Sequence, residues 1–132
     1  MFKLAQLDHV ALSVGDLARS AEWYRAVLGL ERRFQEVWGD VPVMMCVGNT
    51  CLALFPANSQ QPGSSQPEPR LAMRHVAFRA DAPNFLAAQA ELRILKIPFS
   101  FEDHKIAHSI YFNDPDGHKI EITTYLEDHL KS

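Results

Sequence analysis

Cysteines, basic clusters and long apolar runs are all scarce in this sequence of 132 residues. Two cysteines are too few for a disulfide scaffold. No apolar run approaches the roughly 20 residues of a membrane-spanning helix, and the first residues lack the apolar core of a signal peptide. Thirteen Lys and Arg against sixteen Asp and Glu give a net charge of −3, without the basic cluster typical of nucleic-acid binding. We therefore expect a cytoplasmic protein that binds neither nucleic acid nor membranes.

Proline is concentrated in one segment, residues 57–70, which holds three prolines and no large apolar side chain. Such a segment cannot bury enough apolar surface to offset its ordering entropy, so we expect a linker here. It separates a first module, residues 1–56, from a second module, residues 71–126. Each module is small enough to be marginal alone. We expect the two modules to pack on each other, or on a second copy of the chain.

The two modules are predicted to repeat one pattern of a strand, a helix and three further strands. Alternating apolar and polar residues indicate the strands, and apolar residues at helical spacing indicate the helix. His-Val-Ala recurs in both opening strands, 66 residues apart. The first module is expected to have strands over 7–14, 31–38, 41–47 and 50–55 and a helix over 16–28. The second is expected to have strands over 74–80, 99–104, 107–112 and 118–125 and a helix over 81–97, with Phe85, Leu86, Leu92 and Leu95 as its apolar stripe. The pattern predicts an α+β fold of two βαβββ modules with curved sheets.

Three residues with metal-binding side chains are expected on the strand faces opposite the aliphatic residues. They are His9 and His75, in the two opening strands, and Glu121 in the last strand. Two imidazole nitrogens and one carboxylate on one side of a divalent ion leave its other side open to substrate, as at non-haem Fe(II). The alternative is two hydrogen-bonded structural histidines and a carboxylate on a wet face. The symmetric placement of His9 and His75 favours the metal interpretation.

Some further residues allow two interpretations. Cys46 and Cys51 are expected to be cross-strand neighbours, and we interpret them as buried reduced thiols, with a redox pair or soft metal ligands as the alternative. Trp38, Met44 and Met45 are expected either to line a substrate cleft or to pack in the core or at a dimer interface.

Several motifs make the sequence resemble a known family, the vicinal oxygen chelate superfamily. These motifs are Asp8–Val14, Trp23–Tyr24 and Val27–Leu30 in the first module, and His75–Phe78 and Tyr111–Glu121 in the second, the last being the most specific. The superfamily includes extradiol dioxygenases, glyoxalase I, fosfomycin-resistance thiol transferases, an epimerase and metal-free bleomycin-binding proteins. The resemblance implies a partly open, mixed-sheet barrel of paired modules in a homodimer. It also implies a divalent ion held by His9, His75 and Glu121, with Fe2+ or Mn2+ favoured and Zn2+ or Ni2+ possible.

The sequence departs from two enzyme classes of this superfamily, glyoxalase I and the fosfomycin-resistance thiol transferases. Glyoxalase I has a ligand carboxylate where this chain reads Thr50–Phe55, which contains none. The fosfomycin enzymes share the three ligands and Tyr111, but their phosphonate-binding lysine has no counterpart in Phe99–His104. Both departures argue against these two activities.

Extradiol dioxygenases share the three ligands and the tyrosine, so the resemblance favours such an enzyme acting on a small oxygen-rich substrate. Their acid–base histidine falls at Glu102 here, and His108 or His104 is the candidate substitute. The catalytic residues expected are therefore Tyr111 and His108, although a regular strand would place these two side chains on opposite faces. The alternatives are a fosfomycin-type thiol transferase, a glyoxalase-like lyase, and a metal-independent binding protein like the bleomycin-binding members.

Overall fold

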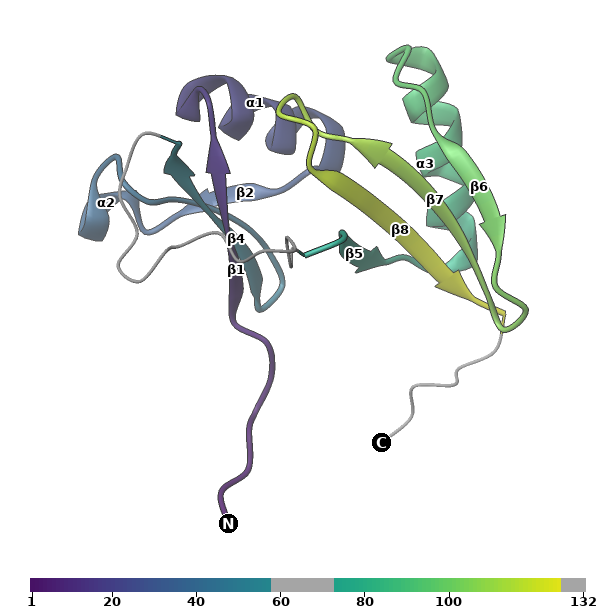
Figure 1. The fold of residues 1–132 in the computed structure, drawn as a ribbon, viewed down its shortest axis with the longest axis horizontal. Coiled ribbons are helices and arrows are strands. Elements are labelled where there is room, and N and C mark those ends of the chain that lie inside the picture. The colour runs from purple at the N-terminus through teal and green to yellow at the C-terminus, as the bar shows by residue number, and fades with distance from the viewer. Residues whose placement is uncertain (58–72, 127–132) are drawn as a thin grey trace, which may run out of the picture. The chain divides into compact units, whose positions relative to one another are not determined.

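The chain divides into two compact units, Met1–Ser65 and Gln66–Ser132. The computed structural model describes residues 1–57 of the first unit and 73–126 of the second. Each unit contains one open, four-stranded mixed sheet and a long helix (Figure 1). The predicted α+β fold with two βαβββ modules is confirmed. The expected linker, residues 57–70, lies outside the described residues apart from Ala57.

The first unit builds its sheet in the order β1-β4-β3-β2, in which β1 runs parallel to β4 and the other pairs are antiparallel. Its elements are β1 (His9–Val14), α1 (Leu17–Leu28), β2 (Glu31–Arg33), α2 (Gln35–Trp38), β3 (Val43–Val47) and β4 (Thr50–Pro56). Helix α1 begins where expected, because the Asp16 carboxylate accepts a hydrogen bond from the Arg19 N–H at 3.0 Å. It ends at Gly29, which adopts a left-handed conformation.

The two faces of the first sheet differ as the alternation predicts. Helix α1 packs against β3 and β4 and buries Tyr24 completely, together with Leu54. The opposite face carries His9, and the register aligns His9 with Cys51 and Ala11 with Ala53. The side chain of His9 is therefore directed away from the helix-covered core.

The strand predicted over residues 31–38 is wrong beyond Arg33. Phe34 adopts a left-handed conformation with a φ of 66°, which ends the extended segment. Its carbonyl then accepts hydrogen bonds from the N–H groups of Val37 and Trp38, at 3.1 and 2.9 Å, and α2 forms. This short helix leaves the Trp38 side chain half exposed, at 50%.

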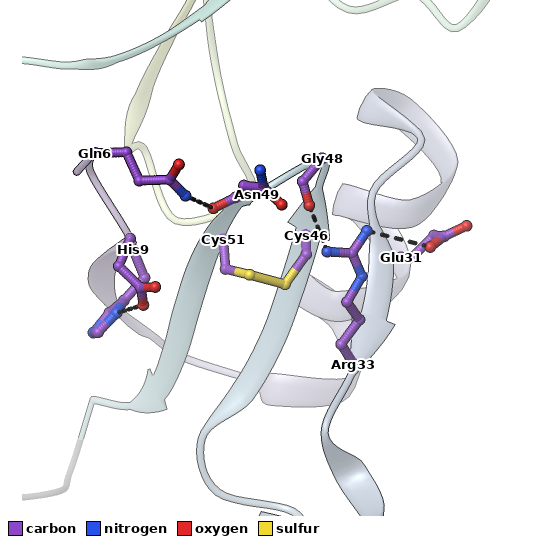
Figure 2. The surroundings of a disulfide bond; sticks show 9 residues. Gln6, His9, Glu31, Arg33, Cys46, Gly48, Asn49 and Cys51 are labelled. Carbon is purple, nitrogen blue, oxygen red and sulfur yellow. Dashed lines mark hydrogen bonds and ion pairs between the residues drawn. A yellow bond between two sulfur atoms is a disulfide. The ribbon is translucent and has the colours of Figure 1, made fainter.

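The expectation of reduced thiols is also wrong, because Cys46 and Cys51 form a disulfide (Figure 2). The two residues are directly opposite in the β3–β4 hairpin, so their side chains share a face, with 4.0 Å between the Cα atoms. Both cysteines are buried, at 1% and 9% exposure. The cross-strand pairing predicted from the turn is correct, whereas the oxidation state had been inferred from compartment alone.

The second unit repeats the topology with the sheet order β5-β8-β7-β6, in which β5 runs parallel to β8. Its elements are β5 (Val76–Arg79), α3 (Ala82–Ile94), β6 (Ser100–Asp103), β7 (Ala107–Asn113) and β8 (Lys119–Tyr125). Asp81 caps α3 by accepting a hydrogen bond from the Asn84 N–H at 3.0 Å. The turn predicted between β7 and β8 is present, with the Gly117 N–H donating to the Asp114 carbonyl at 3.0 Å.

Helix α3 buries only half of its expected apolar stripe. Phe85 and Leu92 are buried, but Leu86 and Leu95 are 67% and 43% exposed. Phe85 and Leu92 are seven residues apart and therefore share a face, whereas Leu86 points about 100° away from Phe85. Leu95 lies beyond the last helical residue. In the described part of the chain, no helix combines the length and apolar character needed to cross a membrane.

Candidate metal centre

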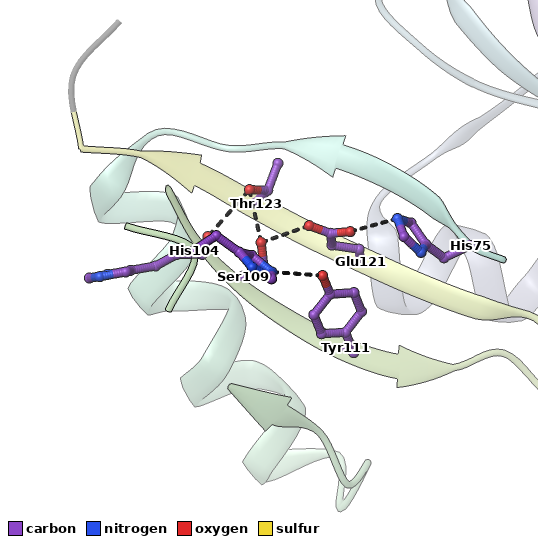
Figure 3. Close-up of polar contacts among 7 residues, drawn as sticks. His75, His104, Ser109, Tyr111, Glu121 and Thr123 are labelled. Carbon is purple, nitrogen blue, oxygen red and sulfur yellow. Dashed lines mark hydrogen bonds and ion pairs between the residues drawn. The ribbon is translucent and has the colours of Figure 1, made fainter. Parts of the chain in front are cut away.

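Glu121 is the centre of a polar group on one face of the second sheet. The register aligns Glu121 of β8 with Ala77 of β5 and Tyr111 of β7, so these three side chains share a face. His75 directly precedes β5, and its Nε2 lies 2.9 Å from Glu121 Oε1 (Figure 3). The Glu121 side chain is 10% exposed and that of His75 is 35% exposed. The Glu121 carboxylate is therefore largely buried, and His75 contacts it from the more exposed side.

Ser109 holds the other oxygen of the carboxylate. Its hydroxyl donates to Glu121 Oε2 at 2.7 Å, and its Oγ lies 3.0 Å from Thr123 Oγ1. Ser109 is fully buried, so this contact is shielded from water. One carboxylate oxygen is thus fixed within the sheet, and Oε1 is left facing His75.

The His75–Glu121 pair fits two neighbouring ligands of a divalent ion. An imidazole nitrogen and a carboxylate oxygen, each about 2.1 Å from an ion and at right angles, lie about 3.0 Å apart. The observed separation of 2.9 Å is that of a direct ion-pair contact between the two side chains, and it is close to this ligand spacing. Within residues 1–57 and 73–126, no three or more His, Cys, Asp or Glu side chains gather into a metal-binding group. The structure therefore brings together two of the three expected ligands, His75 and Glu121.

His9, the third expected ligand, belongs to the first unit and is oriented by its neighbour. Its Nδ1 lies 2.8 Å from Asp8 Oδ2. An ionised carboxylate only accepts hydrogen bonds, so neutral His9 carries its proton on Nδ1 and presents the lone pair of Nε2. Metal-binding histidines commonly have such a carboxylate partner. The Asp8 contact thus engages Nδ1 and leaves the lone pair on Nε2.

Tyr111 lies beside His75 and Glu121, and His104 contacts the Tyr111 hydroxyl. The Tyr111 ring is edge-on to His75, with 5.7 Å between ring centroids, and Tyr111 Oη lies 3.0 Å from His104 Nε2 (Figure 3). Burial and the negative charge of Glu121 raise the pKa of the Tyr111 phenol. The phenol therefore stays protonated and can donate a hydrogen bond.

His108, the other expected catalytic residue, lies on the opposite face. Its ring packs edge-on against Phe101 at 5.2 Å, and its Nε2 is 3.6 Å from Asp103 Oδ1. Phe101 in turn contacts Phe85 of α3, with 6.4 Å between ring centroids. Because strand side chains alternate, the structure does not bring His108 to Tyr111.

The His9 face of the first sheet contains a cavity of about 240 Å³. Asp8 and His9 form one side of it, and Trp38, Met44 and Phe55 are among its apolar lining residues. Trp38 and Met44 thus line this cavity, and Met44, at 5% exposure, also belongs to the core. Met45 is 2% exposed and belongs to the core.

Comparison with known proteins identifies the family. The family model of the Glyoxalase/Bleomycin resistance protein/Dioxygenase superfamily matches residues 6–122. The chain belongs to this superfamily. Metallothiol transferase FosB of Staphylococcus epidermidis (strain ATCC 12228 / FDA PCI 1200) is 31% identical, over 98% of this chain and 89% of its own length.

Solved structures of superfamily proteins have the same fold. Lactoylglutathione lyase from Agrobacterium tumefaciens has a TM-score of 0.73 at 25% identity, covering 92% of this chain and 94% of its own. A glyoxalase/dioxygenase from Nostoc punctiforme has a TM-score of 0.74 at 26% identity, covering 96% and 99%. The predicted resemblance to the superfamily is therefore confirmed.

Two contacts in this superfamily chain were missed from the sequence. The hairpin turn at Asp114 and Gly117 sets a register that pairs Ser109 with Thr123 and Tyr111 with Glu121. Counting back from that turn would have placed Ser109 beside the carboxylate. The Asp8–His9 contact has no comparable signal, because neighbouring residues in a strand normally point to opposite faces.

Proposed function

We propose that this protein is a divalent-metal enzyme in which His75 and Glu121 hold the ion together with His9. The observation that carries the proposal is the 2.9 Å separation of His75 Nε2 and Glu121 Oε1, with Ser109 fixing the second carboxylate oxygen. Imidazole and carboxylate donors suit Fe2+ and Mn2+, and also Zn2+ and Ni2+. The ion would act as a Lewis acid on an oxygen atom of a small substrate.

The reaction we favour is addition of a thiol to a small oxygen-bearing electrophile. The 31% identity with a metallothiol transferase supports this reaction class. In such an addition a carbon–sulfur bond forms, a carbon–oxygen bond of the substrate breaks, and the thiol proton ends on the freed oxygen. Tyr111, held at 3.0 Å by His104, would donate a hydrogen bond to that oxygen.

A second candidate is extradiol dioxygenation, in which both atoms of O2 enter a ring-opened product. The contact between His104 Nε2 and Tyr111 Oη favours it, because ring cleavage uses an acid–base group beside the substrate oxygens. The two candidates consume different co-substrates, a thiol or O2, and are therefore separable by assay.

The test begins with metal content. Protein purified without added metal is analysed by elemental analysis and then titrated anaerobically with Fe2+ and Mn2+. We expect about one ion per chain for the parent, and at least 10–100-fold weaker binding for Glu121→Gln, which keeps the size but removes the charge. Glu91→Gln makes the same change at an exposed site on α3 and should leave metal binding unchanged. Equal metal binding by Glu121→Gln and the parent would overturn the proposal.

The reaction class is tested on the metal-loaded protein. Thiol loss is followed with glutathione and small epoxides, and O2 uptake with an oxygen electrode and catechols. Metal-dependent thiol loss supports the transferase, and metal-dependent O2 uptake supports the dioxygenase. Tight binding of a small molecule by a chain that never retains metal would indicate a metal-independent binding protein instead.

A further inference from the structure

We propose that the 240 Å³ cavity on the first sheet binds an uncharged apolar ring, or a group of that size and polarity, which forms one end of the substrate. The inference deepens the proposed function and rests on it, since only His9 links the cavity to the metal chemistry. It assigns a substrate class that combines an apolar ring with oxygen atoms.

The lining of the cavity is mostly apolar and contains no lysine or arginine. Besides Asp8 and His9, the lining residues are Trp38, Val41, Pro42, Met44, Ala53 and Phe55. Asp8 is the one acidic residue of the lining, and its carboxylate repels anions. At the apolar end of the cavity, away from His9 and the proposed ion, a phosphonate or carboxylate would lose its hydration without gaining a lysine or arginine partner, so we expect this end of the substrate to be uncharged. An uncharged apolar group gains from leaving water.

The volume suits one substituted ring. A cavity of about 150 Å³ lined by aliphatic and phenylalanine side chains holds benzene. The cavity here, at about 240 Å³, has room for such a ring with a substituent, and is smaller than the roughly 300–1,000 Å³ of pockets for drug-sized ligands. Trp38 and Phe55 supply aromatic surface, which favours stacked or edge-on contacts with a ring.

Ala53 is a small residue on the floor of the cavity. The β1–β4 register aligns Ala11 with Ala53, and both are on the His9 face. Next along the same face, the disulfide of Cys46 and Cys51 links β3 to β4 (Figure 2). Trp38 is 50% exposed and Val41 is 48% exposed, so a bound ring would cover apolar surface that now faces water.

The first experiment uses metal-free protein, so that it does not depend on the metal. The chain has two tryptophans, Trp23 and Trp38, and 5-fluorotryptophan labelling gives each a 19F NMR signal. The variant Trp38→Phe assigns them. With EDTA present, benzyl alcohol should shift the Trp38 signal saturably and leave the Trp23 signal in place, whereas methylphosphonate should shift neither.

Two variants and one control locate the binding site. Ala53→Leu fills the floor and should reduce benzyl alcohol affinity at least tenfold. Trp38→Ala removes a half-exposed wall, so it should fold even if Ala53→Leu does not, and calorimetry should show at least fivefold weaker binding. Val37→Ala changes an exposed neighbour on α2 that does not line the cavity, and should bind like the parent.

Several results would overturn the inference. These are an unshifted Trp38 signal, benzyl alcohol binding that neither variant weakens, or methylphosphonate binding as tight as that of benzyl alcohol.

A last arm separates this inference from the proposed function. Catechol carries both a ring and two oxygen atoms, and Mn2+ should raise its affinity at least tenfold in the parent but not in Glu121→Gln. If benzyl alcohol binds and Mn2+ does not, the proposed function fails while the cavity remains a ring site. If Mn2+ binds without raising catechol affinity, the cavity does not serve the metal site and the inference fails alone.

Discussion

Ser109 donates a 2.7 Å hydrogen bond to Glu121 across the β7–β8 hairpin. The contact joins a fully buried hydroxyl to the carboxylate that also meets His75 at 2.9 Å. A carboxylate with one oxygen fixed in this way presents its other oxygen in one orientation. Ser109 is therefore a positioning residue for the proposed metal ligand.

Ser109→Ala should weaken metal binding by about 10–100-fold, the usual cost of losing a partner that orients a ligand. It should also lower the free energy of unfolding by about 1–3 kcal/mol, because a buried carboxylate oxygen loses its donor. Competition with a chromophoric chelator and chemical denaturation measure the two effects. Ser100→Ala, at an exposed position on β6, is the matched control. Parental metal affinity in Ser109→Ala would show that Ser109 does not position Glu121 for metal binding.

Asp8→Asn should separate metal affinity from stability in the first unit. The His9–Asp8 pair is exposed, with side-chain exposures of 47% and 83%, so its loss should change unfolding by less than about 1 kcal/mol. Metal binding should weaken by about tenfold, because His9 Nδ1 loses the carboxylate that fixes the ring. Asp40→Asn, at an 89% exposed carboxylate of the same unit, should change neither quantity. Unchanged metal affinity in Asp8→Asn would mean that the pair has no role at the metal.

Period-two alternation was the most reliable sequence signal. It placed His9 and Glu121 on the faces opposite their aliphatic strand neighbours, in agreement with the register. The same rule placed His108 opposite Tyr111. Strand faces are predictable in this way because the backbone alone imposes them.

The features missed from the sequence depend on single torsions or on neighbouring side chains. The end of β2 depends on the left-handed conformation of Phe34, which no local pattern encodes. The choice between His104 and His108 as the partner of Tyr111 stayed open in the sequence, because His104 lies beyond the end of β6, where alternation no longer applies. Leu86 was assigned to a buried stripe by its apolar character, although its angular position on α3 turns it outward.

The two candidate acid–base histidines form a matched pair for mutation. His104→Ala should lower kcat by about tenfold, or about 1.4 kcal/mol, because Tyr111 loses the partner that holds its hydroxyl. Unfolding should change by less than about 0.5 kcal/mol, since His104 is exposed. His108→Ala should show the reverse, with parental kcat and about 1 kcal/mol lower stability, because its ring packs against Phe101. A large loss of kcat confined to His108→Ala would return the catalytic role to His108.

Tyr111→Phe should reduce turnover while metal content and folding stay unchanged. The hydroxyl is expected to donate a hydrogen bond to the reacting substrate. Its loss should therefore raise the activation free energy of the reaction by about 1–3 kcal/mol. Stopped assays on metal-loaded protein, with metal analysis of the same samples, give both quantities. Parental turnover on the true substrate would make Tyr111 a structural residue.

Reduction of the disulfide should destabilise the protein only modestly. Cys46 and Cys51 are five residues apart and already aligned by the β3–β4 hairpin, so the bond restricts a short loop. The loop-entropy relation gives a loss of about 2 kcal/mol. Denaturation with and without a phosphine reductant measures it, and thiol titration of unfolded protein should find no thiols before reduction and two after it. Two thiols in unreduced protein would restore the reduced-thiol interpretation.

The proposed metal site should be completed by two copies of the chain, with His9 from one and His75 and Glu121 from the other. Each unit is small, and the superfamily resemblance implies a homodimer. His9→Ala and Glu121→Gln should each be inactive alone. Mixed after dissociation, they form dimers of which about half contain one of each chain, and each such dimer has one site with all three ligands.

The mixture should therefore regain about a quarter of the parental metal binding and activity, since one of two sites is restored in about half of the dimers. Each variant dissociated and reassociated by itself serves as a control, because a dimer of two His9→Ala chains or of two Glu121→Gln chains has no complete site. If all three ligands came from one chain, every site in the mixture would lack His9 or Glu121, and no metal binding would return. Light scattering at micromolar concentration gives the mass independently: a monomer there would contradict the shared site, whereas a dimer without complementation would place all three ligands in a single chain.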